Sequence, residues 1–408
     1  MQDNEKKPAL RFKGFTDPWE QRKLGEICDF ITKGATPTTY GFSWQPDGVP
    51  FFRNDSIKDN VFVFGEFSYI SEAANEVLKR SEVHGNDILI AITGDIGKVG
   101  IIPDTVEKAN INQHIARVRI RKEALPYFVY QYLASDDTQK EYQKIKTGLS
   151  MPQLSLEQVR DIVVKIPEFN EQGKIADCLR RIDTLITLHQ RKHEKLVNIK
   201  KSMLDKMFPQ NGVSVPEIRF KGFTDPWEQR KLGDITVELS EYATQELGLP
   251  LLTSSRSGLM YQDEYRDSRT TKSTETLFSV VPVGTCTYRH MSDDDVFHMN
   301  INTLEKGLVS REYPVFEASK GNNLEFLVQH INSSEEFKAF CAEQKKGGTR
   351  TRLYYNTLCQ FTVRVPALKE QAQISQCLKK LDTLITLHQR KLEKLQNIKK
   401  SCLEKMFV

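Results

Sequence analysis

One loop of the sequence has the residue types of a polyanion-binding site: KKGGTRTR, at residues 345–352. Its four cations are Lys345, Lys346, Arg350 and Arg352. The two glycines between them leave the backbone free to adapt its conformation. Lysine and arginine neutralise phosphates, and arginine can also donate two hydrogen bonds to the edge of guanine. The pattern therefore predicts contact with DNA.

Other polar segments supply the remaining residue types that DNA recognition uses. Asparagine and glutamine pair with adenine, and hydroxyl groups contact phosphates. In the first half of the chain the candidates are Lys33, Thr36, Tyr40, Arg53, Asn54, Lys98, Asn112, Gln113, His114, Lys146 and Thr147. In the second half they are Ser254, Arg256, Tyr261, Gln262, Tyr288, Arg289 and His290, with the four cations above. Each one alone is equally compatible with ordinary loop polarity.

The sequence does not contain the motifs that would indicate catalysis by this chain. It has no Pro-Pro dipeptide of the kind found in adenine methyltransferase motifs, and no HExxH spacing among its eight histidines. TGDIGKVG, at residues 93–100, lacks the spacing of a phosphate-binding loop. Its glycines are expected to form a tight turn that aims Lys98 at a DNA phosphate. Seven scattered cysteines without a CxxC pair favour reduced thiols over a disulfide framework or a zinc ribbon.

Composition and charge describe a soluble chain of two or three domains. The 408 residues are 39% hydrophobic and 27% charged, with neither a secretory signal nor a membrane span, so we expect a cytoplasmic protein. The net charge is +4. Arg180–Lys206 and Lys379–Lys405 each hold eight Lys/Arg against three Asp/Glu and together carry +10, which leaves −6 elsewhere. These segments are either solvated helix faces or surfaces close to a polyanion.

Two identical blocks reveal an internal duplication. RFKGFTDPWEQRKLG occupies Arg11–Gly25 and again Arg219–Gly233, and DTLITLHQRK occupies Asp183–Lys192 and again Asp382–Lys391. Each copy therefore has a shared leading segment, a variable body and a shared tail. The period is too long for a solenoid of short repeats. Such a chain can meet one kind of partner twice while its two bodies meet different ligands.

The tails are predicted to be long helices with a heptad seam. Positions seven apart are Ile175, Ile182, His189, Leu196 and Met203 in the first tail, and Ile374, Leu381, His388, Leu395 and Cys402 in the second. This spacing over a charged outer surface is typical of a coiled coil. A helix over Glu171–Phe208 would span roughly 57 Å. If the second helix returns alongside the first, the pair is antiparallel.

The bodies are predicted to mix helices and strands. Asp87–Pro103 has β-branched runs broken by glycines, as in strands joined by tight turns, and Thr276–His290 is its expected counterpart. The leading segment is expected to form a short strand or turn through Trp19 and then a helical stretch over Leu24–Ile31. Phe12, Phe15 and Trp19 are expected to serve as structural anchors.

The order of several motifs resembles the specificity subunits of type I restriction-modification systems. They are WEQRKLGEI at Trp19–Ile27, WEQRKLGDI at Trp227–Ile235, VPFFRNDSI at Val49–Ile57, GNDILIAITGDIGKVGI at Gly85–Ile101, NINQHIARVRI at Asn110–Ile120 and the segment Lys146–Ile186. The second body lacks the GDIGK and NQH patterns. Its GLVSREYPVF, at Gly307–Phe316, is similar to another subclass of these domains.

The resemblance implies a fold and a division into domains. It implies an α/β (α+β) chain with two target recognition domains, residues 1–168 and 218–367. Two long helices, residues 169–209 and 368–408, would separate them and form an antiparallel coiled coil, with a linker at residues 210–217 and a pseudo-two-fold internal repeat.

The resemblance also implies a function without catalysis by this chain. Each recognition domain would read half of a bipartite double-stranded DNA target, and the helices would set the spacing. Two modification subunits would methylate adenine with S-adenosylmethionine, and restriction subunits would use ATP and Mg²⁺, so that this chain itself binds no cofactor or metal. The identical tails are expected to bind the modification subunits through Thr184, Thr187, Gln190, Arg191, Thr383, Thr386, Gln389 and Arg390. The alternatives are a self-contained DNA methyltransferase or nuclease, and a coiled-coil scaffold that does not bind DNA.

Overall fold

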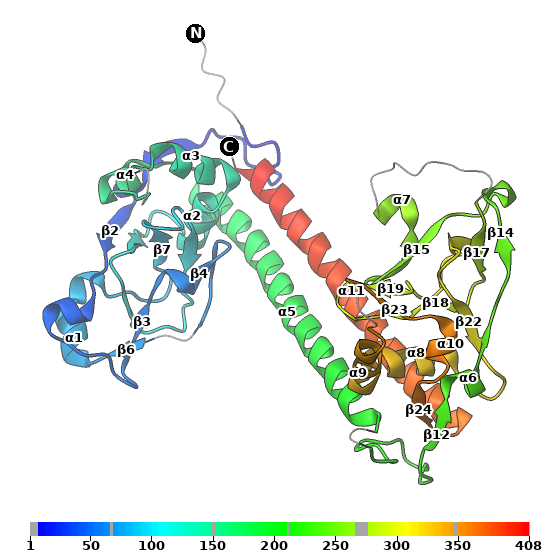
Figure 1. Ribbon diagram of the computed structural model, residues 1–408. Coiled ribbons are helices and arrows are strands. Elements are labelled where there is room, and N and C mark those ends of the chain that lie inside the picture. Colours follow the sequence, from blue (N-terminus) through cyan, green and yellow to red (C-terminus); the bar gives the residue numbers. More distant parts are fainter. Residues whose placement is uncertain are drawn as a thin grey trace. The chain divides into compact units, whose positions relative to one another are not determined.

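The chain folds into two compact units that each mix helices and strands (Figure 1). The structure, a computed structural model, describes residues 7–65, 68–148, 152–209, 212–265, 276–345 and 349–407. Unit 1 comprises Met1–Arg191 and Gln389–Val408, and unit 2 comprises Lys192–His388. The boundaries between the units fall inside two long helices, α5 (Phe169–Met207) and α11 (Leu368–Met406). Each unit therefore contains one part of both helices.

Unit 1 consists of short strands with a few helices packed against them. Its strands are β1 (Glu20–Lys23), β2 (Cys28–Lys33), β3 (Val49–Phe52), β4 (Ile57–Lys58), β5 (Val61–Phe62), β6 (Ser68–Ile70), β7 (Ile88–Ala91), β8 (Val99–Ile101), β9 (Asn110–Ile111), β10 (Ile115–Ile120) and β11 (Val163–Ile166). Its shorter α-helices are α1 (Glu72–Val77), α2 (Pro126–Leu133), α3 (Asp136–Ile145) and α4 (Leu156–Asp161), and its 3-10 helices are η1 (Leu24–Glu26), η2 (Pro37–Tyr40), η3 (Asn54–Ser56) and η4 (Lys79–Ser81).

Unit 2 is built from similar elements. Its strands are β12 (Glu228–Lys231), β13 (Thr236–Glu238), β14 (Tyr242–Ala243), β15 (Leu252–Ser255), β16 (Gly258–Tyr261), β17 (Phe278–Val281), β18 (Cys286–Thr287), β19 (Met291–Ser292), β20 (Asn300–Ile301), β21 (Gly307–Ser310), β22 (Val315–Ala318), β23 (Thr351–Arg352) and β24 (Thr362–Val365). Its shorter helices are α6 (Leu232–Ile235), α7 (Gln262–Tyr265), α8 (Leu324–Ser333), α9 (Glu335–Glu343), α10 (Tyr355–Leu358) and η5 (Gln245–Leu247).

Each unit contains a four-stranded antiparallel sheet, which we call its main sheet. The strand order is β2-β10-β7-β8 in unit 1 and β13-β22-β18-β20 in unit 2. In unit 1, Ala116 of β10 lies opposite Ile90 of β7, and Ile90 lies opposite Val99 of β8. In unit 2, Cys286 of β18 lies opposite both Phe316 of β22 and Ile301 of β20. Strands therefore correspond in pairs, with β18 in the place of β7 and β20 in the place of β8.

The glycine-containing segment of the first body folds as its pattern predicts. β7 and β8 form a hairpin, and Gly94 and Gly97 between them have φ of +77° and +81°. Thr276–His290, its expected counterpart, matches it only in part. Its first strand, β17, belongs to a different sheet with β14 and β21, and its second strand, β18, takes the place of β7.

The two identical leading segments adopt the same pairing in both units. β1 pairs with β11 in unit 1, and β12 pairs with β24 in unit 2. The expected helical stretch Leu24–Ile31 is wrong beyond Glu26, because a single 3-10 turn is followed at Cys28 by β2. Ile31 and Thr32 are β-branched, and pairing with β10 provides the backbone hydrogen bonds that favour a strand there.

Part of α5 and part of α11 pack together in each unit. In unit 1, Ile175 and Leu179 of α5 share a hydrophobic core with Met406 of α11. Further along α5, Asp183 pairs with Lys399, which precedes Met406 in α11, so the two segments run in opposite directions. In unit 2, Lys200 of α5 pairs in the same way with Asp382 of α11.

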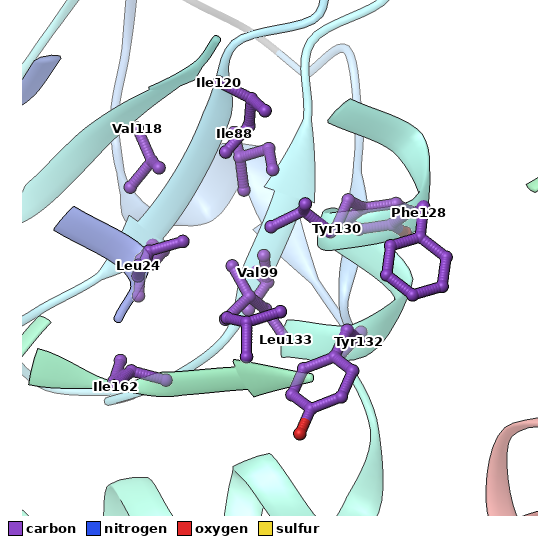
Figure 2. Packing of buried hydrophobic residues seen from close by; sticks show 14 of the residues in the cluster. Leu24, Ile88, Val99, Val118, Ile120, Phe128, Tyr130, Tyr132, Leu133 and Ile162 are labelled. Atoms are coloured by element: carbon purple, nitrogen blue, oxygen red, sulfur yellow. The ribbon is translucent and has the colours of Figure 1, made fainter. Parts of the chain in front are cut away.

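An aromatic cluster seals the contact between each body and the end of a long helix. In unit 1, the ring centre of Phe407 lies 5.5 Å from that of Phe128 and 6.3 Å from that of Trp19. Figure 2 shows Phe128 of α2 among the buried residues of the main sheet, and Phe407 and Trp19 belong to or pack against the same core. In unit 2, Phe208 packs at 5.5 Å against Phe326 and at 6.1 Å against Trp227. The anchoring role expected for Trp19 is therefore that of a ring in this cluster.

A buried ion pair ties each leading segment to the start of the helix that follows its body. Arg11 donates two hydrogen bonds to Glu171, at 2.9 and 2.7 Å, and Arg219 donates two to Glu370, at 2.7 and 2.8 Å. Both glutamates are fully buried. Because a buried carboxylate without its partner is strongly destabilising, each arginine is needed where the identical segment places it.

Candidate nucleic-acid interface

The predicted DNA contacts of unit 1 lie on loops that the structure brings together. We call them the unit 1 loop cluster: residues 33–36, 53–54, 93–98, 112–114 and 146–147. Backbone hydrogen bonds join these loops: Asn112 N donates to Phe52 O at 3.2 Å and Ile92 N to His114 O at 2.9 Å. Gln153 links the last loop to the others, because it forms β-bridges with both Thr147 and Thr93. Lys33, Arg53, Gln113, Lys146 and Thr147 are exposed, so cations, amides and hydroxyls share one surface.

Gly34 permits the closest approach within the unit 1 loop cluster. A methyl group at this position would lie 2.0 Å from the Ile111 carbonyl oxygen and 2.2 Å from that of Asn112. Only glycine allows the end of β2 to touch the Asn112 loop so closely. Across this contact, Thr36 Oγ1 donates to Gln113 Oε1 at 2.5 Å, and Gln113 Nε2 lies 3.1 Å from His114 Nε2.

Several of the predicted contacts in unit 1 are already engaged with protein groups. Asn54 Nδ2 donates to the Thr93 carbonyl at 2.8 Å and so fixes the start of the glycine turn. Arg53 donates to Ser68 Oγ at 2.9 Å and lies 4.8 Å from the centre of the Trp44 ring. Lys98 Nζ lies 2.8 Å from Asp95 Oδ2, and Lys146 Nζ donates to Gln143 Oε1 at 2.7 Å. These bonds orient the side chains before any ligand binds.

Unit 2 has a cleft of about 460 Å³ that is lined by two of its segments, the β15–β16 hairpin and the connection between β18 and β20. We call it the unit 2 cleft. Its lining residues are Ser254, Ser255, Arg256, Ser257, Arg289, Met291, Ser292, Asp293, Asp294, Val296, Phe297 and His298. The cation-rich segment of unit 2 joins this region because β23 pairs with β19, which places Arg352 opposite Met291. Residues 346–348, including the predicted contact Lys346, lie outside the described residues.

Three consecutive aspartates in unit 2 pair with three of the predicted DNA-contacting cations. Asp293 accepts from Arg350 Nε at 2.7 Å, Asp294 accepts from Arg256, and Asp295 lies 3.4 Å from Lys345 Nζ. The Ser292 hydroxyl and, next, the Arg256 guanidinium hold the pKa of Asp294 below its usual value. The sequence analysis did not identify these aspartates. The run of three acids that begins four residues after Arg289 was the signal available.

Burial corrects the expected location of three predicted contacts in unit 2. Tyr288 is fully buried, His290 is 4% exposed and Ser254 is 5% exposed. Tyr288 and His290 flank the exposed Arg289, and Ser254 accepts a hydrogen bond from Asn300 at 2.7 Å. Desolvation lowers the pKa of His290. Tyr288 and His290 pack in the core in this structure, because the segment between β18 and β19 exposes Arg289 and turns its two neighbours inward, while Ser254 lines the unit 2 cleft with most of its surface covered.

The remaining predicted contacts differ in their exposure and in the bonds they form. Tyr40 ends η2 and is 55% exposed. Tyr261 donates to Glu305 at 2.8 Å, a hydrogen bond that raises the pKa of the Tyr261 phenol, and Gln262 begins α7. Asn112 and His114 are half-buried beside Gln113.

The identical blocks of α5 and α11 present similar exposed residues in both units. Thr184, Thr187, Gln190 and Arg191 are exposed on α5, and Thr383, Thr386 and Arg390 are exposed on α11, with Gln389 half-buried. Exposed leucines accompany them, namely Leu185 and Leu188 on α5 and Leu384 and Leu387 on α11. An exposed apolar stripe next to a repeated polar set is typical of a protein-binding surface.

Comparison with known proteins assigns the chain to a family. Residues 16–198 and 298–397 match the family model described as the type I restriction modification DNA specificity domain. These segments cover more than half of the chain, which therefore belongs to this family. The unit 2 aspartates lie outside the matched segments.

Individual relatives carry names of the same kind. The putative type I restriction enzyme MjaX specificity subunit of Methanocaldococcus jannaschii is 22% identical over 94% of this chain and 91% of its own. The EcoBI specificity subunit of Escherichia coli is 29% identical over 39% of this chain and 34% of its own. The type I restriction-modification S subunit from M. genitalium has the same fold, with a TM-score of 0.64, 14% identity and 99% of both chains covered.

Among the described residues, no three His, Cys, Asp or Glu side chains are grouped so that they could hold a metal ion. None of the described helices combines the length and apolar composition of a bilayer-spanning segment.

Proposed function

We propose that the chain reads a bipartite double-stranded DNA target, with unit 1 contacting one half-site and unit 2 the other. One observation carries this proposal: main sheets of the same strand order hold two different sets of cationic, amide and hydroxyl side chains on their loops. A common scaffold with divergent loops is what independent readers of two sequences require.

The domain division proposed for this function follows the sequence repeat. Residues 1–168 and 218–367 are the two target recognition domains, residues 210–217 link them, and residues 169–209 and 368–408 are the helical spacers. The spacers form an antiparallel coiled coil, and the two copies are related by a pseudo-two-fold axis. The antiparallel contacts Asp183–Lys399 and Lys200–Asp382 within the two units support this arrangement.

Exchange of one recognition body tests the division of labour. Residues Lys33–Gly148 are replaced by the equivalent segment of a relative, and the sites that the assembled complex methylates are mapped. We expect one half-site to change and the other to stay the same. A simultaneous change of both half-sites would contradict independent reading, and an unchanged target would contradict DNA reading by unit 1.

The partner-binding surface is proposed to be the repeated block on the two helices. Two modification subunits and the restriction subunits complete the complex, and S-adenosylmethionine, ATP and Mg²⁺ are bound by them rather than by this chain. The exposed leucines Leu185 and Leu384 supply apolar area, and Arg191 and Arg390 supply charge. Interfaces of this kind combine apolar anchors with a polar rim.

Charge reversal tests partner binding. Arg191→Glu with Arg390→Glu is expected to reduce co-purification of the modification subunits, while Lys140→Glu, on the exposed face of α3, serves as a control. Full co-purification of the double variant would remove these arginines from the interface.

The length of the helices is proposed to set the gap between the half-sites. Seven residues inserted into each helix preserve the heptad seam and add about 10.5 Å of helix. This length corresponds to a gap wider by up to about three base pairs. A folded and active variant that still methylates the original spacing would show that the helices do not measure the gap.

A further inference from the structure

The connection between β18 and β20 places carboxylates against the cations that the proposed function assigns to DNA. Asp293, Asp294 and Asp295 follow one another in this connection, and each pairs with a cation: Arg350 and Lys345 from the segment that leads into β23, and Arg256 from the β15–β16 hairpin. DNA phosphates carry the same charge as these aspartates. A surface built only for phosphates would gain nothing from carboxylates at this position.

The atom that Asp293 engages leaves the rest of the arginine available. Arg350 donates through Nε to Asp293 Oδ1 at 2.7 Å. No described residue accepts a hydrogen bond from either Nη of Arg350. These two groups form the fork that donates to O6 and N7 of guanine. Held at Nε, the side chain retains the donors that read a guanine edge and loses freedom to turn toward a phosphate.

Asp294 constrains Arg256 from the hairpin between β15 and β16. Arg256 donates through Nη2 to both carboxylate oxygens of Asp294. Asp294 is itself fixed, because it accepts from Ser292 Oγ at 2.8 Å. Asp295 accepts a hydrogen bond from the buried Thr351 as well as facing Lys345, so the end of the acidic run is anchored to β23.

These pairs are too exposed to be needed for folding. The side chains of Asp293 and Arg350 are 67% and 53% exposed, and those of Arg256 and Asp294 are 65% and 49% exposed. Solvent screens such pairs, which typically contribute little to stability. Their consequence is geometric, because they fix the direction in which each guanidinium points.

Two other arginines of the same surface have no such carboxylate. Arg289 lines the unit 2 cleft and Arg352 lies opposite Met291, and both are exposed. Within the described residues, neither forms an ion pair. Free exposed arginines suit phosphate contacts, which need charge but no fixed direction.

We propose that Asp293 is a positioning residue that reserves Arg350 for a guanine edge in the major groove, while Arg289 and Arg352 take phosphates. The inference rests on the proposed function and names its specificity-determining residues in unit 2. The aspartates bind no ligand. Asp293 excludes phosphates from Arg350 by like-charge repulsion and directs its two Nη groups to a base, while Asp294 holds Arg256 through Nη2.

The test is Asp293→Asn in the full chain, assembled with its modification subunits. Binding to a randomised duplex library is measured, together with the methylated sites. We expect guanine discrimination at one position of the unit 2 half-site to fall about tenfold. The unit 1 half-site should not change. Affinity for unrelated DNA should rise with a steeper salt dependence, because Arg350 becomes free to neutralise about one more phosphate.

Three controls separate positioning from other effects. Asp293→Glu keeps the charge and should restore part of the discrimination. Glu335→Gln removes one exposed negative charge that pairs with Lys338 on α9, and should leave discrimination unchanged. Arg350→Ala should relax the same position as Asp293→Asn and should weaken binding.

Two outcomes would overturn the inference. If Arg350→Ala relaxes the half-site but Asp293→Asn does not, the carboxylate has no positioning role. If neither variant changes the half-site, Arg350 does not read a base. Neither outcome affects the exchange of Lys33–Gly148, which tests reading of the unit 1 half-site. The proposed function is therefore tested separately from this inference.

Discussion

The main sheets of unit 1 and unit 2 differ most clearly in one connection, which joins β7 to β8 in unit 1 and β18 to β20 in unit 2. In unit 1, β7 and β8 are joined by Ile92–Lys98, a turn with two glycines at positive φ. In unit 2, β18 and β20 are joined by the longer Tyr288–Met299, which contains β19 and the three aspartates. The same strand order therefore accommodates a short turn in unit 1 and, in unit 2, a long connection whose strand β19 pairs with β23.

Both connections pair a carboxylate with a predicted DNA-contacting cation, but over different distances in sequence. Asp95 and Lys98 lie within one turn, whereas Asp293 follows β19 and Arg350 precedes β23, so that the two meet at one end of this strand pair. A local pair can change by substitutions within the turn alone. The distant pair needs compatible changes in two loops, so unit 2 is expected to tolerate fewer single substitutions in this region.

Unlike these connections, the aromatic clusters at the ends of the long helices are nearly the same in the two units. Trp19, Phe128 and Phe407 of unit 1 correspond to Trp227, Phe326 and Phe208 of unit 2. The two clusters differ in the residue one helical turn after Phe128 and Phe326. This residue is Tyr132 in α2 and His330 in α8. The two units are thus alike where the long helices dock and differ in the loops that are predicted to contact DNA.

The largest effect is expected from removing a helix-end ring. Phe208→Ala should lower the free energy of unfolding of unit 2 by roughly 3–5 kcal/mol, because Phe208 is 1% exposed and the cavity cannot close around alanine. Phe407→Ala should act similarly on unit 1. Chemical denaturation followed by tryptophan fluorescence measures both, since Trp227 and Trp19 lie in the affected clusters. Losses below 1 kcal/mol would contradict the importance of these rings.

A pH dependence specific to unit 2 is expected next. Burial among aromatic rings lowers the pKa of His330 to about 4, below its ordinary value. The unfolded chain therefore binds the proton first, and stability falls as the pH drops from about 6.5 toward 4, by roughly 3 kcal/mol in all. His330→Phe should remove this component, as measured by thermal unfolding between pH 7 and pH 4. An unchanged pH dependence would show that His330 is not the titrating group.

Crowding at the unit 1 turn predicts a smaller loss of stability. A methyl group at Gly97 would lie 2.5 Å from the ring of the buried Tyr142, in addition to the strain of a φ of +81°. Gly284 has a similar φ of +85° but nothing within 4 Å, so Gly284→Ala isolates the backbone strain. Gly97→Ala should destabilise the chain by about 1–3 kcal/mol more than Gly284→Ala. Equal losses measured by denaturant titration would mean that Tyr142 can move aside.

The smallest effect concerns the salt dependence of DNA binding. Arg352→Ala should weaken binding to all sequences alike and reduce the slope of log K against log salt by about 0.9, as expected for one lost phosphate contact. Shift assays at several salt concentrations measure it. A change in the preferred half-site would instead assign Arg352 to base reading.

The sequence predicted the helices and the glycine turn because their signals are local. The heptad positions Ile175 and Ile182 lie inside α5, and Gly94 and Gly97 form the expected turn. Leu24–Ile31 was mistaken for a helix because the pairing of β2 with β10, far along the chain, decides its conformation.

The site could be predicted only as a set of loops. Each chosen residue type suits DNA, yet strand pairing determines that Arg289 is exposed while Tyr288 and His290 beside it are buried. The Asp293–Arg350 pair depends on two loops meeting through β19 and β23, which the spacing of neither segment indicates.

The docking of Phe407 has a consequence for the order in which the protein can fold during synthesis. The ribosome completes the first body long before it makes residue 407, so the Trp19–Phe128 cluster of the nascent chain stays open to water or chaperones. Unit 2 faces no such delay, since Phe208 precedes the body that receives it and every residue of Lys192–His388 is made in sequence. Unit 2 should therefore be the first to mature, and a chain that stops short of Phe407 should expose unit 1 to proteolysis while leaving unit 2 intact.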